Sequence, residues 1–193
     1  MYDQVTSIDY GSCVKPFSDR FKLITLEDNE LEKVNSFVRL VVKEKNKEEH
    51  YKSDNNSKFK RFYNGIIGEV AIEKLLGMEG KIIDWSVGNS NTYHKPDLSA
   101  IGLKVGIKTV EYGLFPVIFK ISYYPEIINI VYKKKYVYVC GIALKDTLNK
   151  YQSNSLIKDK NLKKRSTKTG FYGFQHLKQF SSIKELKDIT LYD

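Results

Sequence analysis

The chain contains few of the residues that usually build disulfide frameworks and zinc sites. Among its 193 residues there are two cysteines and three histidines. Cys13 and Cys140 lie far apart, and His50, His94 and His176 are scattered without the spacing of metal ligands. We therefore expect neither a disulfide-stapled secreted domain nor a zinc ribbon, and we expect Cys140, within an apolar run, to be a small buried residue.

The sequence also lacks long hydrophobic runs. No segment approaches the length needed to cross a bilayer, and the first residues, MYDQVTSIDYG, do not resemble a signal peptide. No repeat and no low-complexity linker divides the chain, which has only four prolines. We expect a single domain over residues 1–193 that functions in the reducing cytoplasm.

Positive charge is abundant. The formal net charge is +9, with 41% hydrophobic and 28% charged residues. This balance indicates a soluble globular protein with a polyanionic partner, because neutralised phosphates release counterions. No strong basic amphipathic helix favours a membrane surface, so we expect nucleic acid as the partner and no membrane association. The densest positive run, residues 158–168, holds six Lys or Arg residues.

The hydrophobic patterns predict an α/β fold. Helices are expected near residues 28–44, 64–77, 144–152 and 181–188. Strands are expected near residues 21–26, 81–87, 114–122, 126–132 and 136–144. In the second helix, Asn64 is the expected N-cap and Gly77 the expected end. Together these strands predict one sheet of about five strands.

The most informative stretch is HKPDLSAIGLKVGIKTVE, from His94 to Glu111. It predicts a strand entered at Pro96-Asp97, a turn at Ile101-Gly102, and a second strand that contains Lys108. Side chains alternate along strands, so Asp97 and Lys108 are expected as neighbours on one face of the hairpin. Taken alone, Pro-Asp is also a common turn and a strand lysine is often just solvated.

A helix that carries Glu69 and Glu73, followed by Asp97 and then x-x-Lys108, resembles the PD-(D/E)xK nuclease superfamily. The resemblance covers roughly residues 60–145. It implies a restriction-endonuclease-like mixed central β-sheet flanked by α-helices, and Mg²⁺-dependent DNA hydrolysis in which Mn²⁺ can substitute. It further implies Asp97, Glu69 and the Ile107 carbonyl as metal ligands, with Lys108 assisting the attacking water.

The chain departs from the family pattern at position 106. Members normally have Glu or Asp two residues before the lysine, whereas this chain has Gly106. Glu69 is the first candidate to replace that acid, and Glu73 and Glu111 are weaker candidates. Glu111 is three residues from Lys108 and is therefore expected to face away from the site. Alternatively, the glycine marks an inactive site.

The expected substrate is double-stranded DNA, cut by a homodimer whose two-fold axis matches a symmetric site. Expected contacts come from the basic segment 150–193 and from positive side chains elsewhere, namely Lys60, Arg61, Lys120, Lys163, Lys164 and Arg165. The loop at residues 88–95 is a further candidate for approaching DNA. The alternatives are a catalytically inactive DNA-binding protein, a junction-resolving or repair nuclease, and a basic interaction module that only mimics the motif.

Overall fold

The computed structural model describes residues 8–45, 55–86 and 96–191. The α-helices are α1 (Tyr10–Val14), α2 (Asp28–Lys45), α3 (Asn55–Leu76), α4 (Lys145–Lys150), α5 (Lys160–Lys163) and α6 (Ile183–Thr190). The strands are β1 (Lys22–Thr25), β2 (Gly106–Glu111), β3 (Val117–Phe119), β4 (Glu126–Tyr132), β5 (Tyr136–Ala143), β6 (Gln152–Ser153) and β7 (Lys168–Phe171). Short 3-10 helices are η1 (Lys15–Arg20), η3 (Asp97–Ile101), η4 (Asn154–Leu156) and η5 (Phe174–His176).

A mixed four-stranded sheet forms the centre of the protein, with the strand order β1-β5-β4-β2. β1 and β4 pair antiparallel with β5, whereas β2 pairs parallel with β4. β4 and β5 form a hairpin because two apolar runs flank a lysine turn, in which Lys133 and Lys134 have positive φ. β2 is an edge strand, and its register with β4 places Gly106 beside Glu126.

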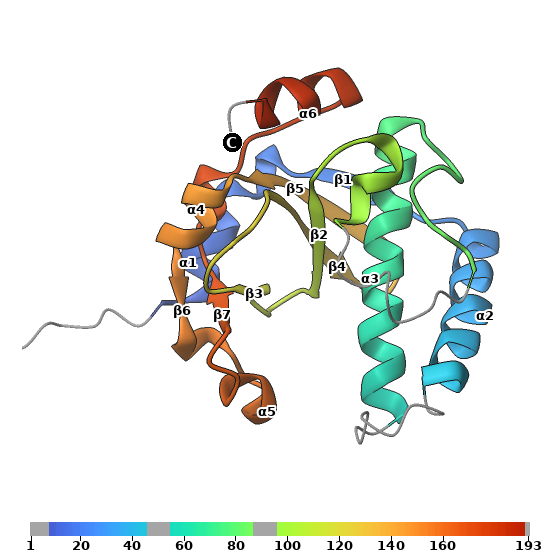
Figure 1. Ribbon diagram of the computed structural model, residues 1–193, viewed down its shortest axis with the longest axis horizontal. Helices are drawn as coiled ribbons and strands as arrows, with labels where there is room; N and C mark the ends of the chain where they lie inside the picture. The colour runs from blue at the N-terminus through green and yellow to red at the C-terminus, as the bar shows by residue number, and fades with distance from the viewer. Residues whose placement is uncertain (1–7, 46–54, 87–95, 192–193) are drawn as a thin grey trace, which may run out of the picture.

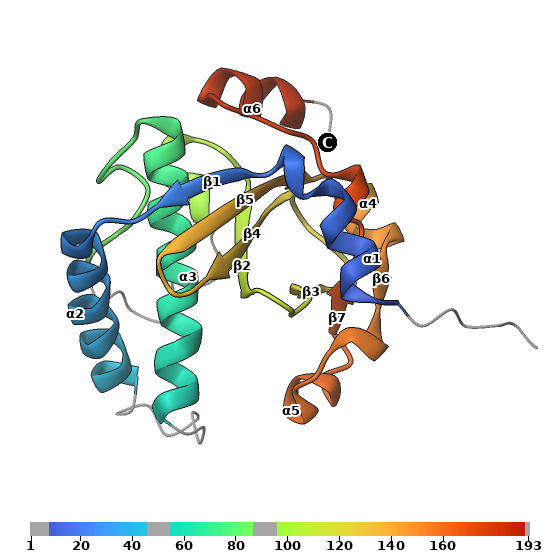
Figure 2. The same ribbon diagram turned by 180° about the vertical axis from the view of Figure 1, so that it is seen from behind.

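The helices α2 and α3 stand side by side on one side of this sheet (Figures 1 and 2). α3 approaches β2 very closely at Gly68, where an added Cβ would lie 1.7 Å from the Thr109 hydroxyl oxygen. Ile72 of α3 packs in one buried cluster with Ile107 and Ile127. The face of the sheet that contains Ile107 and Thr109 is therefore covered by α3.

A second, three-stranded sheet has the order β3-β7-β6 and is antiparallel. Ile118 of β3 and Phe171 of β7 belong to the same buried cluster as Ile128 and Ile130 of β4. The two sheets therefore share a hydrophobic core on the face of the central sheet opposite α3. α1, α4 and α5 lie on this side of the protein (Figure 1).

The expected α/β class is confirmed, and several elements lie where they were predicted. The helix expected over 28–44 is α2, the strands expected over 126–132 and 136–144 are β4 and β5, and the piece expected over 21–26 is β1. The strand expected over 114–122 is reduced to the short edge strand β3, which follows Pro116. After β7 the chain forms a packed turn in which Phe174 and Leu177 are buried.

Other predicted elements are wrong. The second helix begins at Asn55, so Asn64 lies inside α3 and caps nothing, because Phe59, Phe62 and Tyr63 extend the buried face. The described part of 81–87, residues 81–86, contains no strand. Asp97 opens η3 rather than a strand, so the predicted hairpin does not form, and the strands divide between two sheets instead of one five-stranded sheet.

Candidate active site

Asp97 is held against the outer edge of β2. Leu98 donates its N–H to the Val105 carbonyl at 3.0 Å, and Gly102 ends η3 in the left-handed conformation with φ 78°. This compact turn directs the Asp97 carboxylate to β2, where it accepts a hydrogen bond from the N–H of Ile107. Because β2 is an edge strand, this N–H group points away from β4, and the Asp97 carboxylate accepts its hydrogen bond in place of a neighbouring strand.

The Ile107 carbonyl faces this same edge. The N–H groups of Gly106 and Tyr112 point toward β4, where they bond the carbonyls of Pro125 and Val131. Successive residues of a strand alternate in direction, so both polar backbone groups of Ile107 point away from β4 and toward Asp97. This position is compatible with the predicted role of the Ile107 carbonyl as a metal ligand, and that role stays a prediction.

Lys108 and Glu126 form an ion pair across β2 and β4. The distance from Lys108 Nζ to Glu126 Oε1 is 3.4 Å. The side chain of Glu126 is 4% exposed, and its other carboxylate oxygen, Oε2, is buried without a hydrogen-bond partner in the structure. Both side chains point to the face that carries the second sheet, since residues paired in register share a face.

Glu69 approaches from α3. Burial, together with the negative charges of Asp97 and Glu73, raises its pKa to about 8, although Lys108 acts in the opposite direction. Glu69 therefore lies close enough to Asp97 and Lys108 for their charges to change its pKa. The charges of the three predicted residues Glu69, Asp97 and Lys108 thus influence one another around the start of β2.

The remaining pKa shifts show an excess of negative charge in this neighbourhood. Burial raises the pKa of Asp97 and of Glu126, and Lys108 only partly offsets the effect on each. Burial would lower the pKa of Lys108, but Glu126 and Asp97 outweigh it and raise that pKa. One ammonium group thus interacts electrostatically with three carboxyl groups, of which Glu126 is its ion-pair partner. Such clusters of perturbed groups are typical of functional sites.

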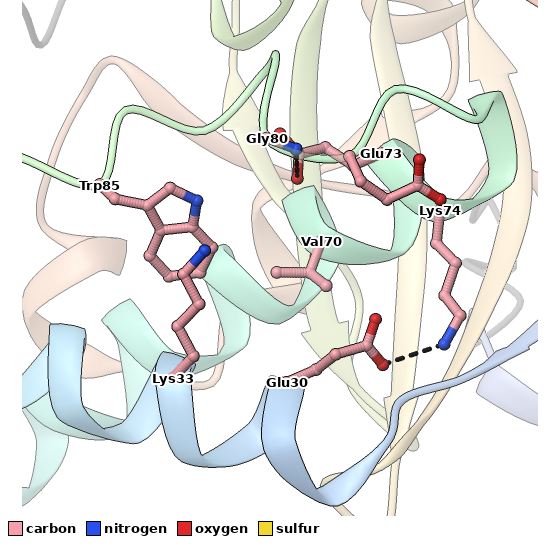
Figure 3. Close-up of a pocket in the computed structure, with 8 residues that line it drawn as sticks. Glu30, Lys33, Val70, Glu73, Lys74, Gly80 and Trp85 are labelled. Atoms are coloured by element: carbon pink, nitrogen blue, oxygen red, sulfur yellow. Dashed lines mark hydrogen bonds and ion pairs between the residues drawn. The ribbon is translucent and has the colours of Figure 1, made fainter.

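The two weaker candidates for the missing acid have other partners. Glu73 is buried and accepts hydrogen bonds from the N–H groups of Gly80, Ile82 and Ile83 at 3.0, 2.7 and 2.8 Å. Figure 3 shows it in a small pocket between α2 and α3, near the ion pair of Lys74 with Glu30. Glu73 thus fixes the segment after α3.

Glu111 pairs with Lys60 instead, at 2.7 Å between Lys60 Nζ and Glu111 Oε2. It also accepts a hydrogen bond from Asn64 Nδ2 at 3.4 Å. Both partners lie on α3, so Glu111 points to the face opposite Lys108, as the strand alternation predicts.

Glu126 was not among the residues singled out from the sequence. It stands in register with Gly106 on the neighbouring strand, so its carboxylate occupies the neighbourhood in which the family pattern places its second acid. One sequence signal points to it: Glu126 opens the otherwise apolar strand EIINIVY. A buried acid in such a strand needs a partner or a function.

The predicted DNA contacts divide into two groups. Lys60 and Arg61 are exposed on the first half of α3, and Lys163, Lys164 and Arg165 are exposed at the end of α5. α3 and α5 lie on opposite sides of β2 (Figure 1). Lys120 follows β3 and is partly buried. The loop at 88–95, with His94, lies outside the described residues.

In the described ranges, no three His, Cys, Asp or Glu side chains converge closely enough to form a preformed metal site. The acids are instead distributed around β2. Over the same ranges, no helix is long and apolar enough to cross a membrane. Comparisons with protein-family models, with curated proteins and with solved structures gave no match.

Proposed function

We propose that this chain is a metal-dependent nuclease that hydrolyses phosphodiester bonds in DNA. The observation that supports the proposal best is that Glu69, Asp97, Lys108 and Glu126 all lie around the start of the edge strand β2. These residues come from four separate elements: α3, η3, β2 and β4. Their types match phosphodiester chemistry, which needs hard oxygen ligands and a positive charge near the phosphate.

The residue types suit a divalent cation, which would have to draw together acids that form no preformed site among the described residues. Three carboxyl groups with raised pKa values lie around the start of β2, and one of them, Glu126, has a buried oxygen, Oε2, without a hydrogen-bond partner in the structure. Glu69, Asp97, Glu126 and the Ile107 carbonyl would hold Mg²⁺ or Mn²⁺. When bound, such an ion activates water and neutralises charge that develops on the phosphate.

Lys108 contributes a positive charge rather than a base. Because Glu126 and Asp97 raise its pKa, its ammonium group stays protonated at neutral pH. It is 27% exposed, so it is accessible from solvent at the margin of the site. From this position its ammonium group can attract a substrate phosphate and hydrogen-bond the attacking water.

The basic side chains account for retention of the polyanionic substrate. Exposed lysines and arginines on α3 and α5 flank β2, and the net charge is +9. Phosphate contacts of this kind position a nucleic acid without reading its sequence. We propose double-stranded DNA as the general substrate and a homodimer as the assembly that cuts both strands.

The proposal is tested by incubating the purified protein with mixed plasmid DNA and Mg²⁺ or Mn²⁺, beside Asp97→Ala and Lys108→Ala variants. Cleavage by the wild type alone supports the proposal and places the site. Absence of cleavage with every divalent ion, together with salt-sensitive retardation of DNA in a gel, favours the inactive DNA-binding protein. Equal activity of the wild type and Asp97→Ala contradicts the assigned site.

A further inference from the structure

The end of β3 and the segment that joins it to β4 expose three large apolar side chains next to the candidate site. Phe119 is 36% exposed, Ile121 70% and Tyr123 75%. Phe119 ends β3 and the chain bends after it, and the Phe119 and Tyr123 rings lie together in an edge-to-face contact. Three exposed large apolar groups within five residues form a continuous patch of the kind that usually contacts a partner. We refer to residues 119–123 as the aromatic segment.

The backbone of the aromatic segment is fixed by hydrogen bonds. The Lys120 N–H donates to the Thr167 carbonyl at 3.0 Å, and Gln152 Nε2 donates to the Lys120 carbonyl at 2.9 Å. The Ser122 N–H donates to Asn149 Oδ1 at 3.0 Å. The exposed rings are therefore presented on an ordered support, which lowers the entropy lost when a ligand binds.

Positive charge lies against the rings. The ammonium nitrogen of Lys168 is 3.1 Å from the centroid of the Phe119 ring, and the Phe119 and Tyr123 rings pack edge to face at 6.3 Å. Burial, then the charges of Lys108 and Arg165, lower the pKa of Lys168 to about 8 against the pull of Glu126. Lys168 and Lys108, from the two sheets, thus influence each other's charge, and Glu126 already acts on both. A substrate phosphate beside Lys168 would add to that compensation.

The aromatic segment leads directly into the candidate site. Tyr124 follows it, and the Tyr124 Cε2 atom lies 2.8 Å from the position that a Cβ of residue 106 would occupy. Glu126, the partner of Lys108, comes two residues later. A strand whose bases contact Phe119 or Tyr123 would therefore have its next phosphates near Lys168 and Lys108.

We propose that the aromatic segment, with Lys168 and Arg165, binds unpaired nucleotides by base stacking and phosphate contact, and so directs a single-stranded part of the substrate to the site at β2. The inference rests on the nuclease function proposed above and specifies its substrate as DNA with an unpaired segment, such as a flap or fork. Bases inside an intact duplex are already stacked on each other, so exposed rings find no free base faces there.

Binding is measured separately from cleavage. Fluorescence anisotropy in EDTA compares a labelled oligothymidylate, a forked duplex and a blunt duplex of equal length, for the wild type, Tyr123→Ala and Tyr123→Phe. Tyr132→Ala is the matched control, because Tyr132 is also exposed and has a lysine, Lys133, 5.2 Å from its ring, but lies at the far end of β4.

We expect the oligothymidylate and the fork to bind more tightly than the blunt duplex. Tyr123→Ala should weaken binding to the unpaired strand by about 5- to 150-fold, a range that corresponds to the loss of one stacked base. Tyr123→Phe and Tyr132→Ala should bind like the wild type. A Phe119→Ala variant should weaken the same binding and leave binding to the blunt duplex unchanged.

Three outcomes overturn the inference. The first is equal affinity for the three DNAs with no effect of Tyr123→Ala. The second is weaker binding of Tyr132→Ala by the same factor. The third is no DNA binding together with a change in the mass of the protein in solution on Tyr123→Ala, which makes the segment a contact between protein chains. If unpaired DNA binds as expected but no divalent ion supports cleavage, the nuclease proposal fails while the binding surface stands.

Discussion

Glu126 stands beside Gly106 in the parallel register of β4 and β2, and its carboxylate pairs with Lys108, two residues further along β2. We propose that Glu126, on the adjacent strand, takes the place of the acid that was expected at position 106. Gly106 also makes room for Tyr124, because a Cβ at position 106 would lie 2.8 Å from Tyr124 Cε2. The glycine is therefore explained by local packing, and it does not by itself indicate an inactive site.

The first prediction concerns Glu126. Glu126→Gln keeps the size of the side chain but removes the charge that pairs with Lys108, so we expect a loss of cleavage on the order of 100-fold or more with little change in DNA binding. The measurement is plasmid cleavage beside gel retardation. Glu111→Gln is the control, because Glu111 is a β2 acid that pairs with Lys60 on the opposite face. Full activity of Glu126→Gln would remove Glu126 from the site.

The second prediction concerns Gly106. Gly106→Ala should displace the Tyr124 ring and lower the free energy of unfolding by about 1–3 kcal/mol, as overpacking does. Gly106→Glu should be worse and should not rescue Glu126→Gln, since the longer side chain meets the same ring. Urea unfolding of Gly106→Ala, Tyr124→Ala and the double variant checks this. The two changes should be strongly non-additive, and additive effects would show that the ring and the glycine are not coupled.

Sequence patterns predicted most accurately the elements that depend only on residues close together in the chain. The hairpin of β4 and β5 follows from two apolar runs around Lys133 and Lys134, and α2 follows from its helical stripe. The proximity of Asp97 to Lys108 was predicted, but through a hairpin that does not exist. η3 achieves it because the Asp97 carboxylate bonds the Ile107 N–H directly.

Relations between distant segments could not be read in the same way. Glu126 was missed because parallel pairing of β2 with β4 depends on tertiary packing rather than on alternation within either strand. The strand expected over 81–87 does not form along residues 81–86, where the amides of Ile82 and Ile83 bond the Glu73 carboxylate. The carboxylate of Glu73, on α3, thus accepts hydrogen bonds from N–H groups that would otherwise pair with a neighbouring strand.

The third prediction concerns pH. Burial, Asp97 and Glu73 raise the pKa of Glu69 from its ordinary value of 4.5 to about 8. Between these two values the folded protein binds more protons than the unfolded chain, so this residue makes the fold less stable as pH rises from 4.5 toward 8. Glu69→Gln removes the effect. Above pH 8 we expect the variant to be more stable than the wild type by roughly 2 kcal/mol or more.

Urea unfolding of both proteins at about pH 5 and about pH 9 measures this difference, which should nearly vanish at the lower pH. Glu32→Gln, at an exposed position on α2, should behave like the wild type at both. A Glu69→Gln variant that is less stable than the wild type at high pH would contradict the proposed charge excess. Since Glu69 is also a proposed metal ligand, the same variant should lose cleavage. A gain in stability together with a loss of cleavage is the result expected for a functional residue.

The last prediction uses two glycines that lie one turn apart on α3. A Cβ at Gly65 meets nothing within 4 Å, whereas one at Gly68 would lie 1.7 Å from the Thr109 hydroxyl oxygen and 2.8 Å from Thr109 Cβ. Gly65→Ala should stabilise the protein by about 0.5–1 kcal/mol, because alanine loses less backbone entropy in a helix. Gly68→Ala should destabilise it by about 3 kcal/mol or more, because the helix must move away from β2.

Unfolding free energies measured for these two variants test the packing that positions Glu69. Displacement of α3 would carry Glu69, the next residue, away from Asp97, so Gly68→Ala should also reduce cleavage at temperatures where the variant is still folded. Gly65→Ala should cleave like the wild type. If Gly68→Ala is as stable and active as Gly65→Ala, α3 does not lie against β2, and the site built on that contact would have to be abandoned.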